Sequence, residues 1–209
     1  KKLIIACDGE SASGKSTAAK LVSKKYKLLL INSGLIYRYC SKIIIRQKPK
    51  NIILFLKKKL KKVSYNLIAK QKLHSEEISN HVAILAKDKK VRIIVNQLQM
   101  KIIRANNRIC VEGRDIASKI LAKNPKYDVA FYFKCNLKVA AFRRWIDLKK
   151  SVPLKEVTKS LKMRTNLDKK RKNSPLIKVN DAILVRSDQL NKKQVLTKMS
   201  KAVDKVLSD

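Results

Sequence analysis

Residues 9–16 read Gly-Glu-Ser-Ala-Ser-Gly-Lys-Ser, and they match the pattern G-x-x-x-x-G-K-[ST] at every position. An apolar run at residues 3–7 precedes them, and a helical pattern of apolar residues follows from Lys15. Glycines let such a loop curl so that its N–H groups converge on phosphate oxygens, and the following helix presents its positive N-terminus to the same anion. The sequence therefore predicts a phosphate-binding loop between a buried strand and a helix.

The loop pattern assigns roles to individual side chains. Lys15 should reach the β- and γ-phosphates of a bound triphosphate, and the Ser16 hydroxyl should bind Mg²⁺. The chain has four glycines in 209 residues, and two of them stand in this loop, which argues against a chance match. The residues expected to bind the cofactor ATP are Gly9, Glu10, Ser11, Ala12, Ser13, Gly14, Lys15, Ser16 and Thr17.

Strand-like and helical segments alternate along the chain. Apolar runs predict strands at 3–7, 28–31, 109–111, 129–133 and 182–185. Helical spacing is present at 15–26, 33–45, 137–148 and 194–207, through 91, 94, 98 and 102, and after Pro153 through Leu161. Residues 51–62 form a lysine-rich amphipathic stretch. Such alternation is typical of an α/β fold with a parallel sheet flanked by helices.

The segment from about 49 to 85 fits this alternation poorly. Residues 63–73 have the two-residue alternation of short strands, whereas Ser75 followed by two glutamates resembles the start of a helix. We therefore predict a single domain, 1–209, whose core is 1–48 and 86–209 and whose inserted subdomain is about 49–85.

The charge of the chain has two interpretations. Lys and Arg number 51 against 15 acidic residues, a net charge of +36, which is typical of nucleic-acid binding. Lysine supplies most of this charge, however, and lysine, isoleucine and asparagine all have A/T-rich codons, so coding bias gives the same composition. Aromatic residues make up 5% and do not interleave with the basic runs, so base-stacking platforms are not evident. We favour coding bias and expect no specific nucleic-acid partner.

Cysteine usage and hydropathy indicate the compartment. The four cysteines contain no C-x-x-C pair, which argues against a zinc site and a disulfide framework. No apolar run approaches the roughly 18 to 20 residues that a membrane span needs. We expect a cytoplasmic protein, monomeric and without a membrane partner.

Arginine is informative in a chain that otherwise uses lysine. A guanidinium binds phosphate through two parallel hydrogen bonds, which an ammonium cannot do. Seven such arginines suggest a site crowded with phosphate, as in transfer between two nucleotides. The candidates are Arg38, Arg92, Arg114, Arg143, Arg144, Arg164 and Arg171.

Four segments, in order, resemble the bacterial cytidylate kinase family. They are residues 7–17 (Cys-Asp-Gly through Thr), 32–38 (Asn-Ser-Gly-Leu-Ile-Tyr-Arg), 111–116 (Val-Glu-Gly-Arg-Asp-Ile) and 164–176, where Arg, Asp and Arg are followed by Ser-Pro-Leu. The resemblance covers nearly the whole chain. It implies the P-loop nucleoside-monophosphate-kinase fold, a five-stranded parallel sheet with a small nucleotide-binding insert and a lid at about 143–171. The implied reaction is phosphorylation of CMP and dCMP by ATP.

The resemblance also implies roles for the acceptor site. Ser33, Asp115 and Arg92 would face the cytosine, with Asp115 accepting from the exocyclic amine. Arg38, Arg114 and Arg171 would grip the acceptor phosphate, and Asp168 and Arg164 the sugar hydroxyls. The lid arginines Arg143 and Arg144 would cover the donor phosphates, so the implied catalytic residues are Lys15, Arg143, Arg144 and Arg171.

This chain departs from the family pattern at several positions. Glu10 replaces the loop proline, Asn32 replaces an aspartate, and Ala140 stands where a further lid arginine is common. Ala83 stands where a serine often contacts cytosine, so weaker base discrimination is expected. The insert is also shorter than is usual.

Two other functions remain open from the residues alone. Another small-molecule kinase on the same fold, of the UMP, AMP or shikimate type, would share the loop and the arginines. A basic nucleic-acid-binding protein that uses its loop as a nucleotide switch would share the charge, and binding of RNA above physiological salt would distinguish it.

Overall fold

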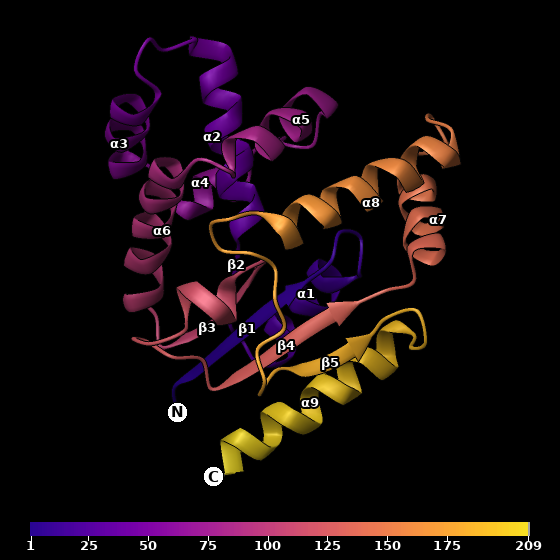
Figure 1. Cartoon of the computed structure of the whole chain (residues 1–209). Coiled ribbons are helices and arrows are strands. Elements are labelled where there is room, and N and C mark those ends of the chain that lie inside the picture. The colour runs from indigo at the N-terminus through magenta and orange to yellow at the C-terminus, as the bar shows by residue number, and fades with distance from the viewer. Residues whose placement is uncertain (209) are drawn as a thin grey trace. The chain divides into compact units, whose positions relative to one another are not determined.

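The structure is a computed structural model that describes residues 1–208 (Figure 1). Strands and helices alternate through most of it. The elements are β1 (Leu3–Gly9), α1 (Lys15–Lys25), β2 (Leu29–Asn32), α2 (Ser33–Gln47), α3 (Ile52–Lys62), α4 (Tyr65–Ala69), α5 (Glu76–Leu85), α6 (Lys89–Arg104), β3 (Arg108–Gly113), the single π-helical turn η1 (Ile116–Ile120), β4 (Val129–Lys134), α7 (Leu137–Asp147), α8 (Leu154–Lys170), β5 (Ile183–Arg186) and α9 (Lys192–Ser208).

The five strands form one sheet in the order β2-β3-β1-β4-β5. β1 is central and pairs in parallel with β3 and β4, and β4 pairs in parallel with β5. The register places Asp8 of β1 opposite Gly113 of β3. Because parallel strands end at the same edge, the ends of β1 and β3 lie next to each other. The predicted α/β fold with a five-stranded parallel sheet is confirmed.

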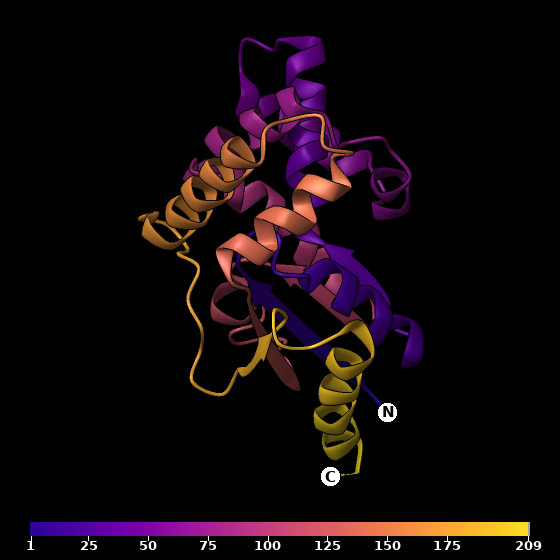
Figure 2. The ribbon, with the colours of Figure 1, turned by 90° about the vertical axis from the view of Figure 1, so that its right-hand side faces the viewer.

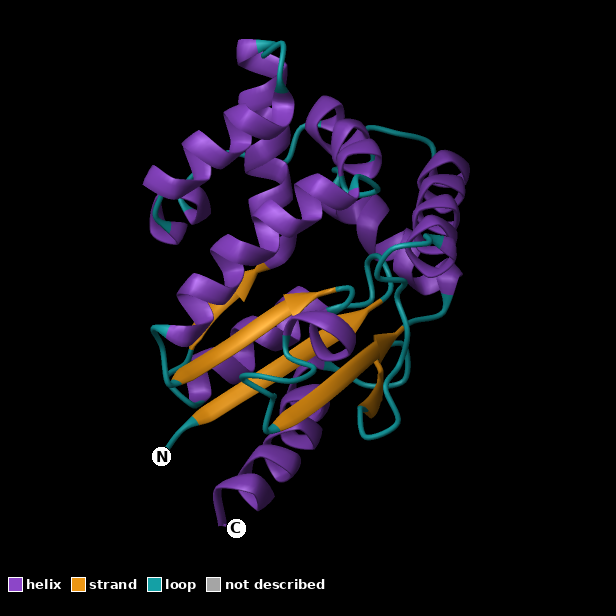
Figure 3. Cartoon of the chain, turned by 60° about the vertical axis from the view of Figure 1, so that its left-hand side comes forward, coloured by secondary structure: helices purple, strands orange, loops and turns teal. Residues whose placement is uncertain are grey.

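Period-two alternation along β1 divides its side chains between the two faces of the sheet. Leu3, Ile5 and Cys7 are fully buried and join a core with α1 and α9. The core residues of these helices include Ala18, Ala19, Val22, Val195, Met199 and Val203. On the opposite face, η1 packs against β1 and β3, and Figure 3 shows it in front of the strands.

The chain divides into two compact units. Unit 1 comprises residues 1–30 and 107–209, and unit 2 comprises residues 31–106. Unit 2 is therefore larger than the predicted insert, 49–85, which lies within it. Its described elements are helices apart from the end of β2, and α2 packs against α4, α5 and α6.

Unit 1 contains a helical pair besides the sheet. α7 and α8 pack side by side (Figures 1 and 2) around a small apolar cluster that includes Ala140, Ala141, Val157 and Leu161. Ala140 is 2% exposed, so this position, where an arginine is common in the resembling family, is filled here by helix packing. The predicted lid, about 143–171, spans most of this pair.

Two expectations about local structure need correction. The predicted short strands at 63–73 are wrong, because this segment contains α4, whose N-cap Ser64 accepts a hydrogen bond from the Leu67 N–H. Its buried residues Tyr65 and Ile68 are three apart, a helical spacing. α8 runs nine residues beyond the predicted end at Leu161. This extension was not predicted because its mainly polar residues leave no apolar pattern. η1 was not predicted.

The start of α5 is confirmed, since the Ser75 side chain accepts from the Ile78 N–H. Among the helices of residues 1–208, none has the length and apolar character that crossing a bilayer demands.

Candidate active site

The phosphate-binding loop connects β1 to α1, as predicted. β1 ends at Gly9, and a Cβ there would lie 2.5 Å from the Phe133 carbonyl oxygen of β4, so only glycine fits. Gly14 is the N-cap of α1 and has φ of 73°, a left-handed conformation that glycine adopts without strain. The Glu10 N–H donates to Phe133 O at 3.1 Å, and Ser13 Oγ donates to Glu10 O at 2.9 Å. The loop is therefore anchored to β4 and folded by its own polar groups.

Lys15 and Ser16 meet a carboxylate at the end of β3. Lys15 Nζ lies 3.1 Å from Glu112 Oε2, and Ser16 Oγ donates to the same oxygen at 2.7 Å. Lys15 and Glu112 are 6% and 2% exposed. Glu112 was not among the predicted site residues. The sequence signal that could have identified Glu112 is an acidic residue at the end of an apolar strand, directly before the Gly-Arg-Asp segment.

The electrostatics of Lys15 follow from its burial. Desolvation lowers the pKa of its ammonium, and nearby Arg114 also lowers it. Glu112 acts in the opposite direction and favours the charged form. Because the Lys15 ammonium is already desolvated, exchanging its carboxylate partner for a phosphate oxygen removes no further water from it, whereas the buried Glu112 carboxylate then needs another cation.

Asp8 fixes the turn that carries the Gly-Arg-Asp segment. Its Oδ1 accepts from the Ile116 N–H and its Oδ2 from the Ala117 N–H, each at 2.8 Å. Burial raises the pKa of this carboxyl to about 6, although the two backbone hydrogen bonds and Lys15 oppose the shift. Asp8 thereby anchors η1 at the edge of the sheet where β1 and β3 end.

Four predicted acceptor-site residues form one network in unit 1. Arg114 Nε donates to Asp168 Oδ2 at 2.8 Å, and Arg171 NH1 lies 3.5 Å from Asp168 Oδ1. Arg171 NH2 also contacts Asp115 Oδ1 at 3.3 Å, and its Nε donates to the Ser174 carbonyl. Asp168 thus bridges the two arginines, and the segments at 111–116 and 164–176 meet although some fifty residues separate them in sequence.

The remaining predicted residues of unit 1 lie around the loop and on the helical pair. Arg114 NH2 approaches Ser11 Oγ at 3.4 Å, which connects the network to the phosphate loop. Lys169 Nζ lies 2.7 Å from Glu10 Oε1, so the residue that replaces the loop proline pairs with α8. Arg143 NH1 donates to the Ser187 carbonyl at 3.0 Å. Arg144 of α7 and Arg164 of α8 are half-buried, and Thr17 is exposed at the start of α1.

Unit 2 holds the three other predicted residues, Ser33, Arg38 and Arg92. Ser33 Oγ donates to Gln99 Oε1 at 2.5 Å. Arg38 NH1 donates to the Leu73 carbonyl at 3.0 Å and to Ser79 Oγ at 2.9 Å. Arg92 is 5% exposed, its guanidinium lies 5.8 Å from the centre of the Tyr37 ring, and NH1 donates to the Ala86 carbonyl.

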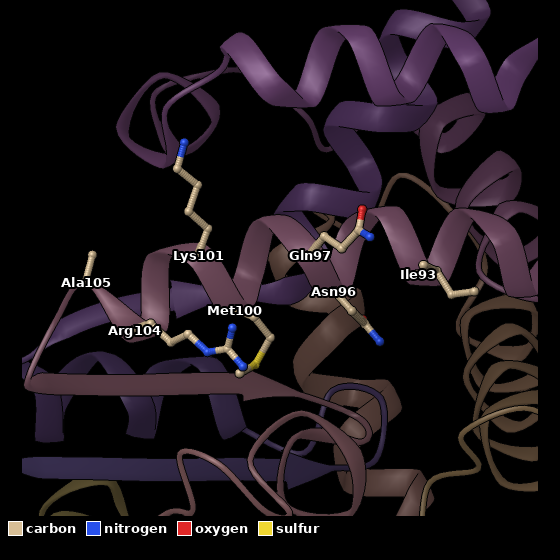
Figure 4. A pocket seen from close by; sticks show the side chains of 7 residues that line it. All are labelled: Ile93, Asn96, Gln97, Met100, Lys101, Arg104 and Ala105. Atoms are coloured by element: carbon tan, nitrogen blue, oxygen red, sulfur yellow. The ribbon is translucent and has the colours of Figure 1, made fainter.

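A groove runs along α6 in the same unit (Figure 4). It is lined by Ile93, Asn96, Gln97, Met100, Lys101, Arg104 and Ala105. None of these seven is a predicted site residue, so this groove is not the predicted acceptor site.

The oxygen atoms beside Lys15 suit a hard cation. Ser16 Oγ and Glu112 Oε2 are 2.7 Å apart, and hydroxyl and carboxylate oxygens are the ligands that Mg²⁺ prefers. Within residues 1–208 there is no cluster of three or more His, Cys, Asp or Glu side chains placed to hold a metal. A magnesium ion that takes most of its ligands from nucleotide phosphates and water needs few protein ligands, so it needs no such cluster.

The parallel sheet, the glycine-dependent loop after β1 and the lysine at the start of α1 define an α/β protein of the P-loop nucleotide-binding class. The cytidylate kinase family model matches residues 5–205, and the chain belongs to this family. A cytidylate kinase from Fusobacterium nucleatum is 31% identical over 218 residues, covering 98% of each chain. One from Listeria innocua is 30% identical and covers 95% of each chain.

Solved structures support the fold. An uncharacterised protein from Eubacterium ventriosum superposes with a TM-score of 0.58 at 16% identity, covering 98% of this chain and 99% of that one. The protein TT1252 from Thermus thermophilus superposes with a TM-score of 0.54 at 15% identity, covering 98% and 97%. At such identities the likeness extends to the fold alone.

Proposed function

We propose that this chain transfers the γ-phosphoryl group of ATP to CMP and dCMP, which gives ADP and CDP or dCDP. The observation that carries the proposal is the ion-pair network of Arg114, Asp115, Asp168 and Arg171. It joins two segments that are expected to bind a nucleoside monophosphate, in a chain that belongs to the cytidylate kinase family. It also reaches the phosphate loop through Ser11.

On the donor side, the loop N–H groups and the N-terminus of α1 bind the phosphates of ATP. Lys15 leaves Glu112 for a phosphate oxygen and follows the charge that develops during transfer. Ser16 and Glu112 would hold Mg²⁺, which supplies positive charge to the β- and γ-phosphates when bound. Phosphoryl transfer needs no protein nucleophile, because positioning and charge neutralisation provide most of the catalysis.

On the acceptor side, the proposal assigns the phosphate of CMP to Arg38, Arg114 and Arg171. Each guanidinium offers parallel donors that match phosphate oxygens, and a phosphate can replace a carboxylate partner such as Asp168. Asp168 and Arg164 then hold the sugar hydroxyls.

The base is read by hydrogen bonds. Ser33, Arg92 and Asp115 face the cytosine, and the Asp115 carboxylate accepts from the exocyclic amine. Uracil has a carbonyl oxygen at the same position, which the carboxylate repels.

The helical pair of unit 1 serves as the lid in this proposal. Arg143 and Arg144 of α7 cover the transferring phosphate, and closure keeps water from the phosphoryl group. The enzyme acts as a cytoplasmic monomer.

Direct identification of the product tests the proposal. ATP labelled in its γ-phosphoryl group, incubated with the protein, Mg²⁺ and CMP, should give labelled CDP, and dCMP should give labelled dCDP. Label recovered only as inorganic phosphate, or transferred to AMP, UMP or shikimate but not to CMP, would contradict the proposal.

A further inference from the structure

Ser33 and Gln99 form a buried hydrogen bond between two helices of unit 2. Ser33 is the first residue of α2, and Gln99 lies near the middle of α6. Ser33 Oγ donates to Gln99 Oε1 at 2.5 Å, and the two residues are 7% and 1% exposed. Val95, Leu98 and Ile103 on the same helix are at most 8% exposed, so packing holds Gln99 in place.

This bond decides what the serine hydroxyl can offer to a ligand. A hydroxyl has one proton and two lone pairs. With its proton directed to Gln99, Ser33 can only accept a further hydrogen bond. To donate elsewhere it would have to leave the Gln99 carbonyl buried without a partner, which is costly.

We propose that Gln99 is a positioning residue that makes Ser33 a hydrogen-bond acceptor toward the base and so favours cytosine over uracil. The inference rests on the proposed function, in which Ser33 faces the base of the acceptor nucleotide. The exocyclic amine of cytosine donates a hydrogen bond, whereas the corresponding oxygen of uracil accepts one. An acceptor-only Ser33 therefore matches cytosine and leaves uracil without a partner.

The test is a double-mutant cycle read as the ratio of kcat/KM for CMP to kcat/KM for UMP. Gln99→Leu removes the acceptor and frees the Ser33 proton, so the ratio should fall about tenfold. Ser33→Ala should lower the ratio to the same extent. The double variant should have the ratio of Ser33→Ala alone, because Gln99 acts through the hydroxyl. Gln97→Leu is the matched control: Gln97 is exposed on the same helix, lines the groove in Figure 4 and should leave the ratio unchanged.

A cooperative melting transition establishes that each variant is folded, and Gln99→Met replaces Gln99→Leu if the leucine variant does not fold. A ratio within twofold of the unmodified protein in a folded Gln99 variant would overturn the inference. An unchanged ratio in Ser33→Ala would also overturn it, and that measurement needs no Gln99 variant. A double variant whose change in the ratio equals the product of the two single changes would overturn it too. If the unmodified protein turns over no CMP, the proposed function fails as well, whereas a CMP-preferring protein with an unaltered variant ratio overturns this inference alone.

Discussion

Ion pairs hold Lys15, Arg114 and Arg171 of unit 1, whereas a neutral hydrogen bond holds Ser33 of unit 2. In unit 1 the basic groups form ion pairs: Lys15 with Glu112, Arg114 and Arg171 with Asp168, and Arg171 also with Asp115. In unit 2, Ser33 hydrogen-bonds the neutral side chain of Gln99, and Arg38 hydrogen-bonds a backbone carbonyl and a serine. Ion pairs suit cations that must exchange one anion for another, whereas a buried neutral hydrogen bond suits Ser33, which must offer a fixed pattern to a base.

The comparison assigns phosphate binding mainly to unit 1 and part of base selection to unit 2. Asp115 of unit 1 takes part in both functions, because it pairs with the phosphate-binding Arg171 and is also proposed to bind the cytosine amine. Substitutions of unit 1 cations should therefore lower turnover with every acceptor, whereas substitutions of base-reading groups should change the preference among acceptors.

The largest effect is expected for Lys15→Ala. The variant removes the buried charge aimed at the transferring phosphate, so kcat/KM for every acceptor should fall at least about 10³-fold, or ~4 kcal/mol. Lys20→Ala, an exposed position on α1, should retain the activity of the unmodified protein. Coupled ADP-release rates and a melting curve check both. A folded Lys15→Ala protein within tenfold of the unmodified rate would refute the loop assignment.

A smaller loss is expected for Arg171→Lys. The charge remains, but a single ammonium cannot reproduce two parallel hydrogen bonds, so kcat/KM for CMP should fall about 30-fold. Arg186→Lys should have no comparable effect, because the Arg186 side chain is 43% exposed and pairs with Asp188. Steady-state kinetics with CMP varied give the comparison. Unchanged kcat and KM would remove Arg171 from the acceptor site and leave it as a structural ion-pair partner of Asp115 and Asp168.

Asp115→Asn should change the preference for CMP over UMP more than it changes the turnover rate. An amide can turn its NH₂ toward the uracil oxygen, so the CMP-to-UMP ratio of kcat/KM should fall about tenfold. The KM for ATP should stay within about twofold, and Asp147→Asn on α7 is the control for loss of an acid. A ratio that survives Asp115→Asn would remove Asp115 from base selection.

The smallest effect concerns Asp8, which bonds backbone N–H groups. Its pKa is raised from 3.8 to about 6, so the folded protein keeps this proton at pH values where the unfolded chain has lost it. Its contribution to the free energy of unfolding therefore falls as pH rises from about 4 to 6. Relative to Asp8→Asn, the unmodified protein should lose about 1 kcal/mol between pH 5 and pH 7, measured by urea unfolding. A difference that is constant or grows with pH would contradict this.

The sequence predicted the sheet and the loop because both depend on local patterns. Apolar runs predicted all five strands, and the loop motif placed Gly9, Gly14 and Lys15 where the structure has them. α4 was missed because a five-residue helix offers too few apolar positions to distinguish a period of three from one of two. Glu112 and Gln99 were missed because their roles depend on which strand or helix lies beside them, and a single sequence does not contain that information.

The most direct test of this account is the rate of ADP release by the unmodified protein with CMP, dCMP, UMP or AMP as the acceptor. CMP and dCMP should both be phosphorylated, with kcat/KM for CMP at least about tenfold above that for UMP. A protein that used UMP or AMP better than CMP would contradict it.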